Sequence, residues 1–218
     1  LRRALAQHTR VVLTAPPGAG KTTRVPLDLL QAGWLGDGKI ILLEPRRIAA
    51  RAAAHRMAQS LGQKLGETVG LRVRMESRIS SKTRIEVVTE GVFTRMILDD
   101  PELPGIACVI FDEFHERSLD ADIGLALSVE VSDALRDDLR LVVMSATLDG
   151  PRIAALLGKT TPVIVSEGRA FPVETRHRAR DVNDTLEDAM VAAVTPALNA
   201  EHGSILCFLP GEREIRAT

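Results

Sequence analysis

The sequence is poor in aromatic residues: its 218 positions include no tyrosine, one tryptophan and five phenylalanines. We therefore expect no aromatic platform on which nucleic-acid bases could stack in series. The two cysteines, Cys108 and Cys207, both lie in apolar runs, so we predict that they fill core positions in a cytoplasmic protein. No apolar stretch is long enough to span a bilayer, and we expect no membrane partner.

An excess of charge of either sign is also missing. The 28 basic and 29 acidic side chains leave a formal net charge of −1. Net charge therefore neither favours nor excludes nucleic acid, and only local clusters of basic residues could indicate it. The hydrophobic fraction of 45% is sufficient for a packed core. The length suits one large α/β domain, or one full domain and part of a second.

Short β-rich runs alternate with helical stretches along most of the chain. Several runs are almost entirely apolar, which is typical of parallel strands covered on both faces. We predict an α/β fold with a mostly parallel sheet and helices on both faces. Residues 70–81 alternate apolar and basic side chains and predict an extra strand or ribbon. The strands are predicted at 11–15, 39–43, 84–88, 107–111, 141–145 and 163–165, and the helices at 21–32, 47–61, 90–98, 119–136 and 151–157.

A polar, glycine-containing stretch at 166–170 predicts a linker. After it we predict a strand at 171–178, a helix at 184–199 and a buried strand at 204–209. The Thr195-Pro196 pair is expected to bend this helix or end it early. We accordingly divide the chain into a first domain at 1–167, and a linker with the beginning of a second α/β domain at 168–218.

The most informative segment is 15–22, Ala-Pro-Pro-Gly-Ala-Gly-Lys-Thr, which directly follows a predicted strand. Gly18 and Gly20 allow the backbone to wrap around a phosphate, with N–H groups facing its oxygens. Lys21 would reach the β- and γ-phosphates, and the Thr22 hydroxyl would ligate Mg²⁺. The first position is alanine where the usual pattern has glycine. We predict a phosphate-binding loop; the alternative is a turn before an ordinary helix.

A second predicted strand ends in two adjacent carboxylates, Asp112 and Glu113. The carboxyl ends of parallel strands face one crevice, so this pair is expected near the phosphate loop. Asp112 would hold Mg²⁺, mainly through water, and Glu113 would accept a proton from the water that attacks the γ-phosphate. His115 follows closely, and by itself it is more simply explained as a surface histidine.

Two hydroxyls, Ser145 and Thr147, stand at the end of another predicted strand. They could hydrogen-bond the carboxylate pair and sense the state of the nucleotide. The alternative, which the tripeptide alone favours, is a helix N-cap.

Two further segments suit the backbone of a nucleic acid. Arg46 and Arg47 lie at a predicted helix start, where guanidinium groups and the helix N-terminus both favour phosphate. Thr89-Glu90-Gly91 repeats this layout after the next strand. The alternatives are a solvated arginine pair and an ordinary helix cap. The basic residues of 72–84 could line the same strand path, although such a run is more often a solvated face.

These segments, in this order, resemble superfamily 2 helicases of the DEAH/RHA type. Within that family the sequence is most similar to the bacterial HrpB branch, with Phe114 where most DEAH proteins have alanine. The resemblance covers nearly the whole chain. The segments that carry it are 18–23, 45–50, 89–92, 112–117, 145–148 and 206–211.

The resemblance implies a RecA-like P-loop NTPase fold. It also implies ATP-driven translocation on, or unwinding of, a nucleic acid, with RNA favoured over DNA. It implies ATP and Mg²⁺ as cofactors, with Glu113, Lys21 and Asp112 as catalytic residues. Mg²⁺ would be held at Thr22, Asp112 and Glu113. The implied ATP-binding residues are Pro17, Gly18, Ala19, Gly20, Lys21, Thr22, Thr23 and the base-stacking Arg56; the coupling residues are His115, Ser145 and Thr147; and the nucleic-acid contacts are Arg46, Arg47, Thr89, Glu90 and Gly91.

In this family a complete second RecA-like domain supplies arginine fingers, which in related enzymes contribute ~10³–10⁵ in turnover. The sequence stops before such motifs, so we expect it to bind ATP and ADP but to hydrolyse ATP weakly without the rest of that domain and the C-terminal region. The alternative is a non-catalytic module whose binding of RNA or protein is switched by nucleotide. A kinase or GTPase is disfavoured because no Asn-Lys-x-Asp pattern is present.

Overall fold

The computed structural model describes residues 1–147, 149–167, 172–200 and 202–218. The chain divides into two compact units, Leu1–Arg169 and Ala170–Thr218, which are described separately.

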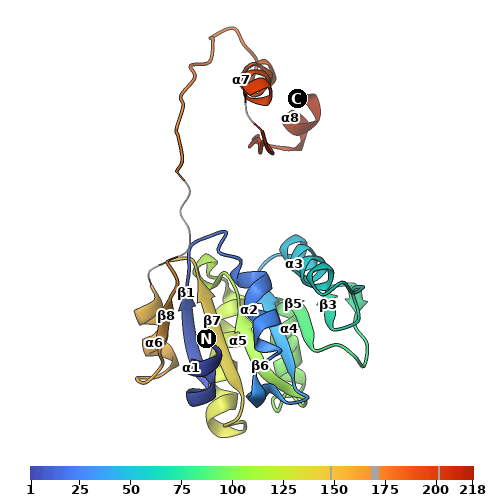
Figure 1. The fold of residues 1–218 in the computed structure, drawn as a ribbon, viewed down its shortest axis with the longest axis vertical. Helices are drawn as coiled ribbons and strands as arrows, with labels where there is room; N and C mark the ends of the chain where they lie inside the picture. The colour runs from blue at the N-terminus through green and yellow to red at the C-terminus, as the bar shows by residue number, and fades with distance from the viewer. Residues whose placement is uncertain (148, 168–171, 201) are drawn as a thin grey trace. The chain divides into compact units, whose positions relative to one another are not determined.

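The first unit is built on one eight-stranded sheet with the strand order β4-β3-β5-β2-β6-β7-β1-β8 (Figure 1). Neighbouring strands are parallel except β3 and β4, which form an antiparallel ribbon. All the strands predicted before residue 166 are confirmed, and the 70–81 segment forms the ribbon. The strands are β1 (Arg10–Thr14), β2 (Lys39–Glu44), β3 (Val69–Val73), β4 (Glu76–Arg78), β5 (Ile85–Thr89), β6 (Ile106–Phe111), β7 (Arg140–Ser145) and β8 (Val163–Val165).

Helices cover both faces of this sheet, as predicted, because alternate side chains of each buried strand point to opposite faces. In β2, Ile40 and Leu42 join one apolar cluster, and Ile41 and Leu43 join the other. The first cluster packs under α1 (Arg2–Gln7), α2 (Lys21–Leu29) and α3 (Arg47–Ser60). The second packs under α4 (Glu90–Asp99), α5 (Leu119–Ala134) and α6 (Gly150–Leu157), and short 3₁₀ turns lie at η1 (Gly33–Leu35) and η2 (Phe114–Glu116).

The phenylalanine at position 114 belongs to the second cluster. Its ring meets that of Phe111 edge-on, with centroids 6.2 Å apart, and Phe111 meets Phe93 in the same way at 5.8 Å. Edge-to-face pairs add to the free energy gained from area burial alone. An alanine at 114 could not make this contact, so the phenylalanine anchors the turn after β6 to the core.

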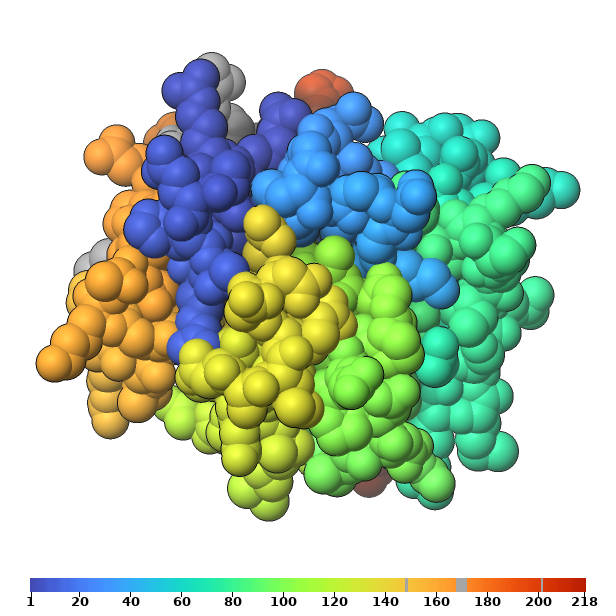
Figure 2. Space-filling model, turned by 90° about the horizontal axis from the view of Figure 1, so that it is seen from below, coloured from blue at the N-terminus to red at the C-terminus, as the bar shows by residue number. Residues whose placement is uncertain are grey.

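The amino ends of the strands are closed by structural contacts. Arg10, at the start of β1, donates to the Leu157 carbonyl at 2.7 Å and also bonds the Ser132 and Asp133 side chains. Figure 2 views this end of the first unit from below, where the dark blue, yellow and orange segments lie side by side. The residues expected to carry function lie at the opposite, carboxyl end of the sheet.

The second unit contains two helices within its described residues, α7 (Leu186–Ala200) and α8 (Glu212–Ala217). The helix predicted at 184–199 is confirmed, but the early end at Thr195-Pro196 is wrong because α7 continues through Pro196. Proline has no N–H to donate to the carbonyl four residues earlier. That carbonyl, of Ala192, instead accepts a hydrogen bond from the Arg178 guanidinium.

The two strands predicted in this unit are not formed. Residues 172–178 and 204–209 have no regular secondary structure, and Phe171 lies outside the described residues, as do 168–170 of the predicted linker. A β-strand needs a neighbouring strand for its backbone hydrogen bonds. The described part of this unit offers none, so Leu206 and Phe208 remain exposed.

Among the residues that the structure describes, no helix has the length and apolar character needed to cross a bilayer.

Candidate nucleotide-binding site

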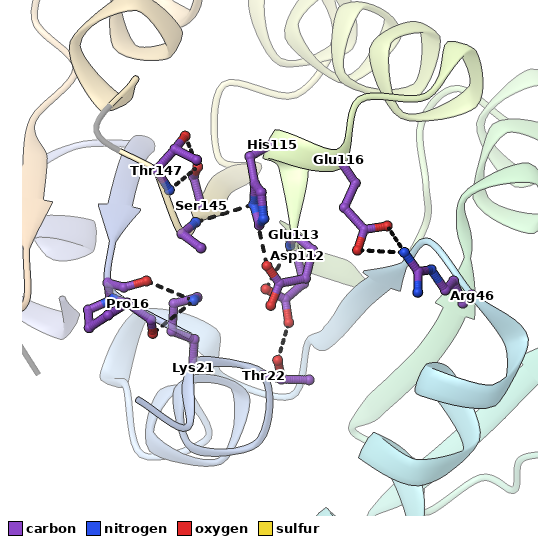
Figure 3. A network of polar contacts seen from close by, with 12 residues as sticks. Pro16, Lys21, Thr22, Arg46, Asp112, Glu113, His115, Glu116, Ser145 and Thr147 are labelled. Carbon is purple, nitrogen blue, oxygen red and sulfur yellow. Dashed lines mark hydrogen bonds and ion pairs between the residues drawn. The ribbon is translucent and has the colours of Figure 1, made fainter. Parts of the chain in front are cut away.

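The predicted phosphate loop connects β1 to α2. Gly18 and Gly20 have φ values of +76° and +78°, a region that favours glycine. No side chain caps α2, so N–H groups of its first turn stay available to an anion. Lys21 is only 6% exposed, and its Nζ donates to the carbonyls of Ala15 at 2.8 Å and Pro16 at 3.4 Å (Figure 3). The Lys21 ammonium group is thus held against the backbone of the loop.

Asp112 directly follows β6 and joins this loop to the second motif. One of its carboxylate oxygens accepts a hydrogen bond from the Thr22 hydroxyl, and the other accepts one from the Glu113 N–H at 2.8 Å. Residues that lie far apart in the sequence therefore meet, as predicted, at one edge of the sheet (Figure 3). A hydroxyl and a carboxylate are the hard oxygen donors that Mg²⁺ prefers.

The donor set around Thr22 and Asp112 is incomplete for a metal on its own. Within the described residues, no group of three or more His, Cys, Asp or Glu side chains could hold an ion. Mg²⁺ usually keeps several waters and is shared with substrate phosphates. The residues present fit an ion that arrives with a nucleotide.

Glu113 occupies a strained position. Its backbone is left-handed, with a φ of +47°, which is uncommon for a residue with a side chain. Such strain concentrates at functional sites, where the surrounding structure maintains it. The Glu113 carboxylate is partly exposed, and its Oε2 lies 3.4 Å from His115 Nδ1.

His115 connects the carboxylate pair to the segment after β7. The Ala146 N–H donates to His115 Nδ1 at 3.3 Å, so this nitrogen acts as an acceptor and the proton of a neutral ring is on Nε2. The same nitrogen lies 3.4 Å from Glu113 Oε2, a contact that is an ion pair when the ring is protonated. The ring has a contact on both motifs, which a simple surface histidine would not need.

The two hydroxyls at the carboxyl end of β7, of Ser145 and Thr147, bond each other. Ser145 Oγ and Thr147 Oγ1 are 3.2 Å apart, and the Thr147 N–H donates to Ser145 Oγ at 3.2 Å. The helix-cap interpretation is wrong, because Asp149 holds the N-cap position of α6. Among the hydrogen bonds of the described residues, none joins either hydroxyl to Asp112 or Glu113. The connection passes through His115 instead.

Glu44 is a site residue that we did not predict. It ends β2, is 2% exposed, and lies beside Asp112. Burial, as the largest cause, together with the nearby carboxylates of Asp112, Glu113 and Glu116 raises its pKa to about 9. The signal in the sequence was a carboxylate closing an apolar strand, but only the strand order places β2 next to β6.

A cavity of about 570 Å³ opens between the start of α2 and α3. It brings Arg56 close to Thr22, Thr23 and Glu113, as expected for a residue that contacts a bound nucleotide. Its remaining lining consists of Glu44 and the small side chains Ala49, Ala52 and Ala53.

A second cavity, of about 860 Å³, gathers most of the predicted nucleic-acid residues. Arg47 lies there with Thr89, Glu90 and Gly91, and the ribbon adds Arg72 and Arg74. Thr89 holds the N-cap position of α4, yet its side chain makes no capping hydrogen bond. The basic run therefore contributes to this cavity in part. Arg84 bonds the Gly36 and Gly38 carbonyls instead.

Arg46 does not line this cavity. Its guanidinium is exposed and donates to both carboxylate oxygens of Glu116 at 3.0 Å (Figure 3). This pair links the Arg46-Arg47 segment to the turn that carries Glu113. The alternative of a solvated arginine pair therefore describes only part of the environment of Arg46, which is exposed but also bonds Glu116.

Comparisons with known proteins agree on one family. A family model described as DEAD/DEAH box helicase matches residues 1–156. The sequence is 52% identical over 216 residues to the ATP-dependent RNA helicase HrpB of Escherichia coli K12, covering 99% of this chain and 26% of that protein. It is 38% identical over 222 residues to the HrpA homologue of Haemophilus influenzae, covering 100% of this chain and 17% of that protein.

Solved structures give the same result. The crystal structure of the Escherichia coli DEAH/RHA helicase HrpB matches with a TM-score of 0.87, and 52% of residues are identical. The match covers 99% of this chain and 27% of that one. The chain therefore spans about a quarter of the length of these HrpB proteins.

Proposed function

The chain belongs to the DEAD/DEAH box helicase family, and from that premise we propose that it carries the ATP-binding core of an ATP-dependent RNA helicase. The observation that supports this most directly is the meeting of Lys21, Thr22, Asp112 and Glu113 at one edge of the sheet. We assign residues 1–167 to the first RecA-like domain and 168–218 to a linker and the beginning of a second. The proposal includes a cytoplasmic location, where both free cysteines would stay reduced.

Nucleotide binding would use the loop 17–20 and the residues that follow it. Backbone N–H groups of Pro17-Gly18-Ala19-Gly20 and of α2, apart from proline, would face the phosphate oxygens. Lys21 would exchange its two carbonyl acceptors for the β- and γ-phosphates. Because the side chain is buried and already bonded, little conformational freedom would be lost on binding.

Thr22 and Asp112 would hold Mg²⁺ together with the phosphates, with Glu113 beside them. When bound, the ion neutralises charge that develops on the phosphates. The Thr22–Asp112 hydrogen bond keeps both oxygens at one place before any ligand arrives. This order in the free protein is what electrostatic preorganisation requires.

Glu113 would accept the proton of the attacking water. His115 Nδ1, which accepts a hydrogen bond from the Ala146 N–H, lies 3.4 Å from Glu113 Oε2, so this histidine contacts the segments of both motifs. A change at Glu113 would be transmitted through His115 to Ser145 and Thr147. This chain of contacts supports a coupling role for these three residues.

RNA would bind at the cavity that contains Arg47, Thr89, Glu90 and Gly91. Guanidinium groups and the α4 N-terminus suit phosphates. A Cβ at Gly91 would lie 3.2 Å from Asp120 Oδ2, so the packing of α4 against α5 favours glycine there. Arg46 would also contact the RNA backbone, after its ion pair with Glu116 breaks. Arg56 would contact the base of the bound nucleotide.

Calorimetry with ADP and Mg²⁺ tests the nucleotide site directly. We expect the 218-residue chain to bind and Lys21→Ala to lose detectable binding. Absence of binding by the unchanged chain would contradict the proposal. Low ATP turnover by this chain stays a prediction, and strong RNA-stimulated turnover would contradict it.

Anisotropy of a labelled single-stranded RNA, at a fixed salt concentration, tests the second cavity. We expect Arg47→Ala to weaken binding and to reduce its dependence on salt, since a phosphate contact releases counterions. Lys82→Ala is the matched control, because Lys82 is exposed and does not line that cavity. Equal losses in both variants would indicate non-specific charge attraction only.

A further inference from the structure

Glu44 is costly for the fold. The side chain is 2% exposed, and its Oε1 atom has no hydrogen-bond partner among the described residues. A buried polar atom without a partner destabilises a protein, and an apolar side chain of the same shape would avoid that cost. Folding therefore gives no reason for a carboxyl group at this position.

The location of Glu44 supplies a reason. The Leu43 carbonyl accepts the Asp112 N–H at 3.1 Å, so the backbone of β2 holds the start of the Asp112 turn. The Glu44 side chain lies beside the Asp112 carboxyl group, which accepts hydrogen bonds from the Thr22 hydroxyl and the Glu113 N–H. Glu44 also lines the cavity shared by Thr22, Arg56 and Glu113. The Glu44 side chain therefore lies next to the donors expected for Mg²⁺.

Resting on the proposed nucleotide site, we propose that Glu44 is a positioning residue for the magnesium-bound nucleotide. Its buried carboxyl group fixes Asp112 in place, and through Asp112 it orients a donor that would hold Mg²⁺. Residues that orient metal ligands in this way typically contribute 10–100-fold in metal affinity. Glu44 itself touches neither the phosphates nor the reacting water.

The test measures ADP affinity by calorimetry, once with Mg²⁺ and once with a chelator in its place. In Glu44→Leu, which keeps the volume and removes both oxygens, we expect affinity with Mg²⁺ to fall about 10-fold. Affinity with the chelator should stay within about 2-fold, because Lys21 and the loop are unchanged. The melting temperature should be equal to or above that of the unchanged chain, because the buried polar atoms are gone.

Two other substitutions at this position keep the proposal falsifiable if Glu44→Leu does not fold. Glu44→Gln retains both a donor and an acceptor at full length, so we expect near-normal affinity with Mg²⁺. Glu44→Asp retains the carboxyl group but is one methylene shorter, and it should lose affinity like the leucine variant. An aspartate variant that binds Mg²⁺–ADP normally would overturn the proposal.

Glu86→Gln is the matched control, since Glu86 is an equally buried carboxylate on the neighbouring strand β5. It lies 2.6 Å from Arg72 and away from the nucleotide cavity. We expect this variant to lower the melting temperature and leave the effect of Mg²⁺ on ADP affinity unchanged. If Glu44→Leu behaves like this control, Glu44 is structural and the proposal fails. If the unchanged chain does not bind ADP, the proposed function fails first.

Discussion

The two units of the chain respond differently to the same sequence patterns. In Leu1–Arg169, apolar runs become strands whose side chains are buried on both faces. In Ala170–Thr218, the apolar run 204–209 stays irregular, and neither helix has a buried residue. The difference shows that an apolar run specifies a strand only when neighbouring strands and covering helices are available. The following predictions test whether the first unit is packed and the second unit is exposed in solution.

The two cysteines should show the largest effect. Cys108 is fully buried in β6, as predicted, and burial raises the pKa of its thiol to about 12. Cys207 is exposed, so the prediction that it fills a core position is wrong. The thiolate is the reactive form, so at pH 8 the raised pKa alone should slow alkylation of Cys108 by about 10³. Mass spectrometry after a timed pulse of iodoacetamide would measure both rates.

If Cys207 were protected as well as Cys108, the second unit would have a packed core. The proposed difference between the two units would then be wrong. Denaturant provides the control, because both thiols should then react at the same rate.

A pair of phenylalanines gives the next largest effect. Phe111 is fully buried between Phe93 and Phe114, whereas Phe208 is 83% exposed. Phe111→Ala should cost about 3–5 kcal/mol because it leaves a cavity in the core. Phe208→Ala should change the free energy of unfolding by no more than about 0.5 kcal/mol. Chemical denaturation followed by circular dichroism would measure both.

The outcome for Phe208 separates two explanations of its apolar character. A loss above 1.4 kcal/mol, a tenfold change in the folding equilibrium, would indicate that residues 204–209 pack in solution. A negligible loss would agree with the exposed run that the structure shows.

The sequence predicted the first unit well because its signals are local. Apolar runs, the glycine-rich loop and the paired carboxylates each depend on neighbouring residues, and the parallel sheet then brings strand ends to one edge. Glu44 was missed because its meaning depends on strand order, which places β2 beside β6. The helix-cap interpretation of Ser145 and Thr147 failed for a similar reason. The tripeptide does not show that Asp149 begins the next helix, or that His115 approaches Ala146.

The second unit was predicted less well because the strands predicted in it depend on hydrogen bonds to residues outside their own segments. The helix near 184–199 forms since its hydrogen bonds are internal to one segment. A strand at 204–209 would need a partner that the described residues of this unit do not supply. The residue roles assigned to the nucleotide and RNA sites likewise stay predictions, which the binding experiments above would decide.

Ion pairs should give the smallest difference between the units. Arg10 in the first unit is 16% exposed and bonds Asp133, which is 65% exposed, together with Ser132 and the Leu157 carbonyl. In the second unit Arg216 bonds Glu212, and both side chains are 78% exposed. Asp133→Asn should cost up to about 1 kcal/mol, and Glu212→Gln close to zero, because water screens an exposed pair. Thermal unfolding at low and high salt would measure both, and only the Asp133 effect should persist in high salt, since a partly buried pair is screened less.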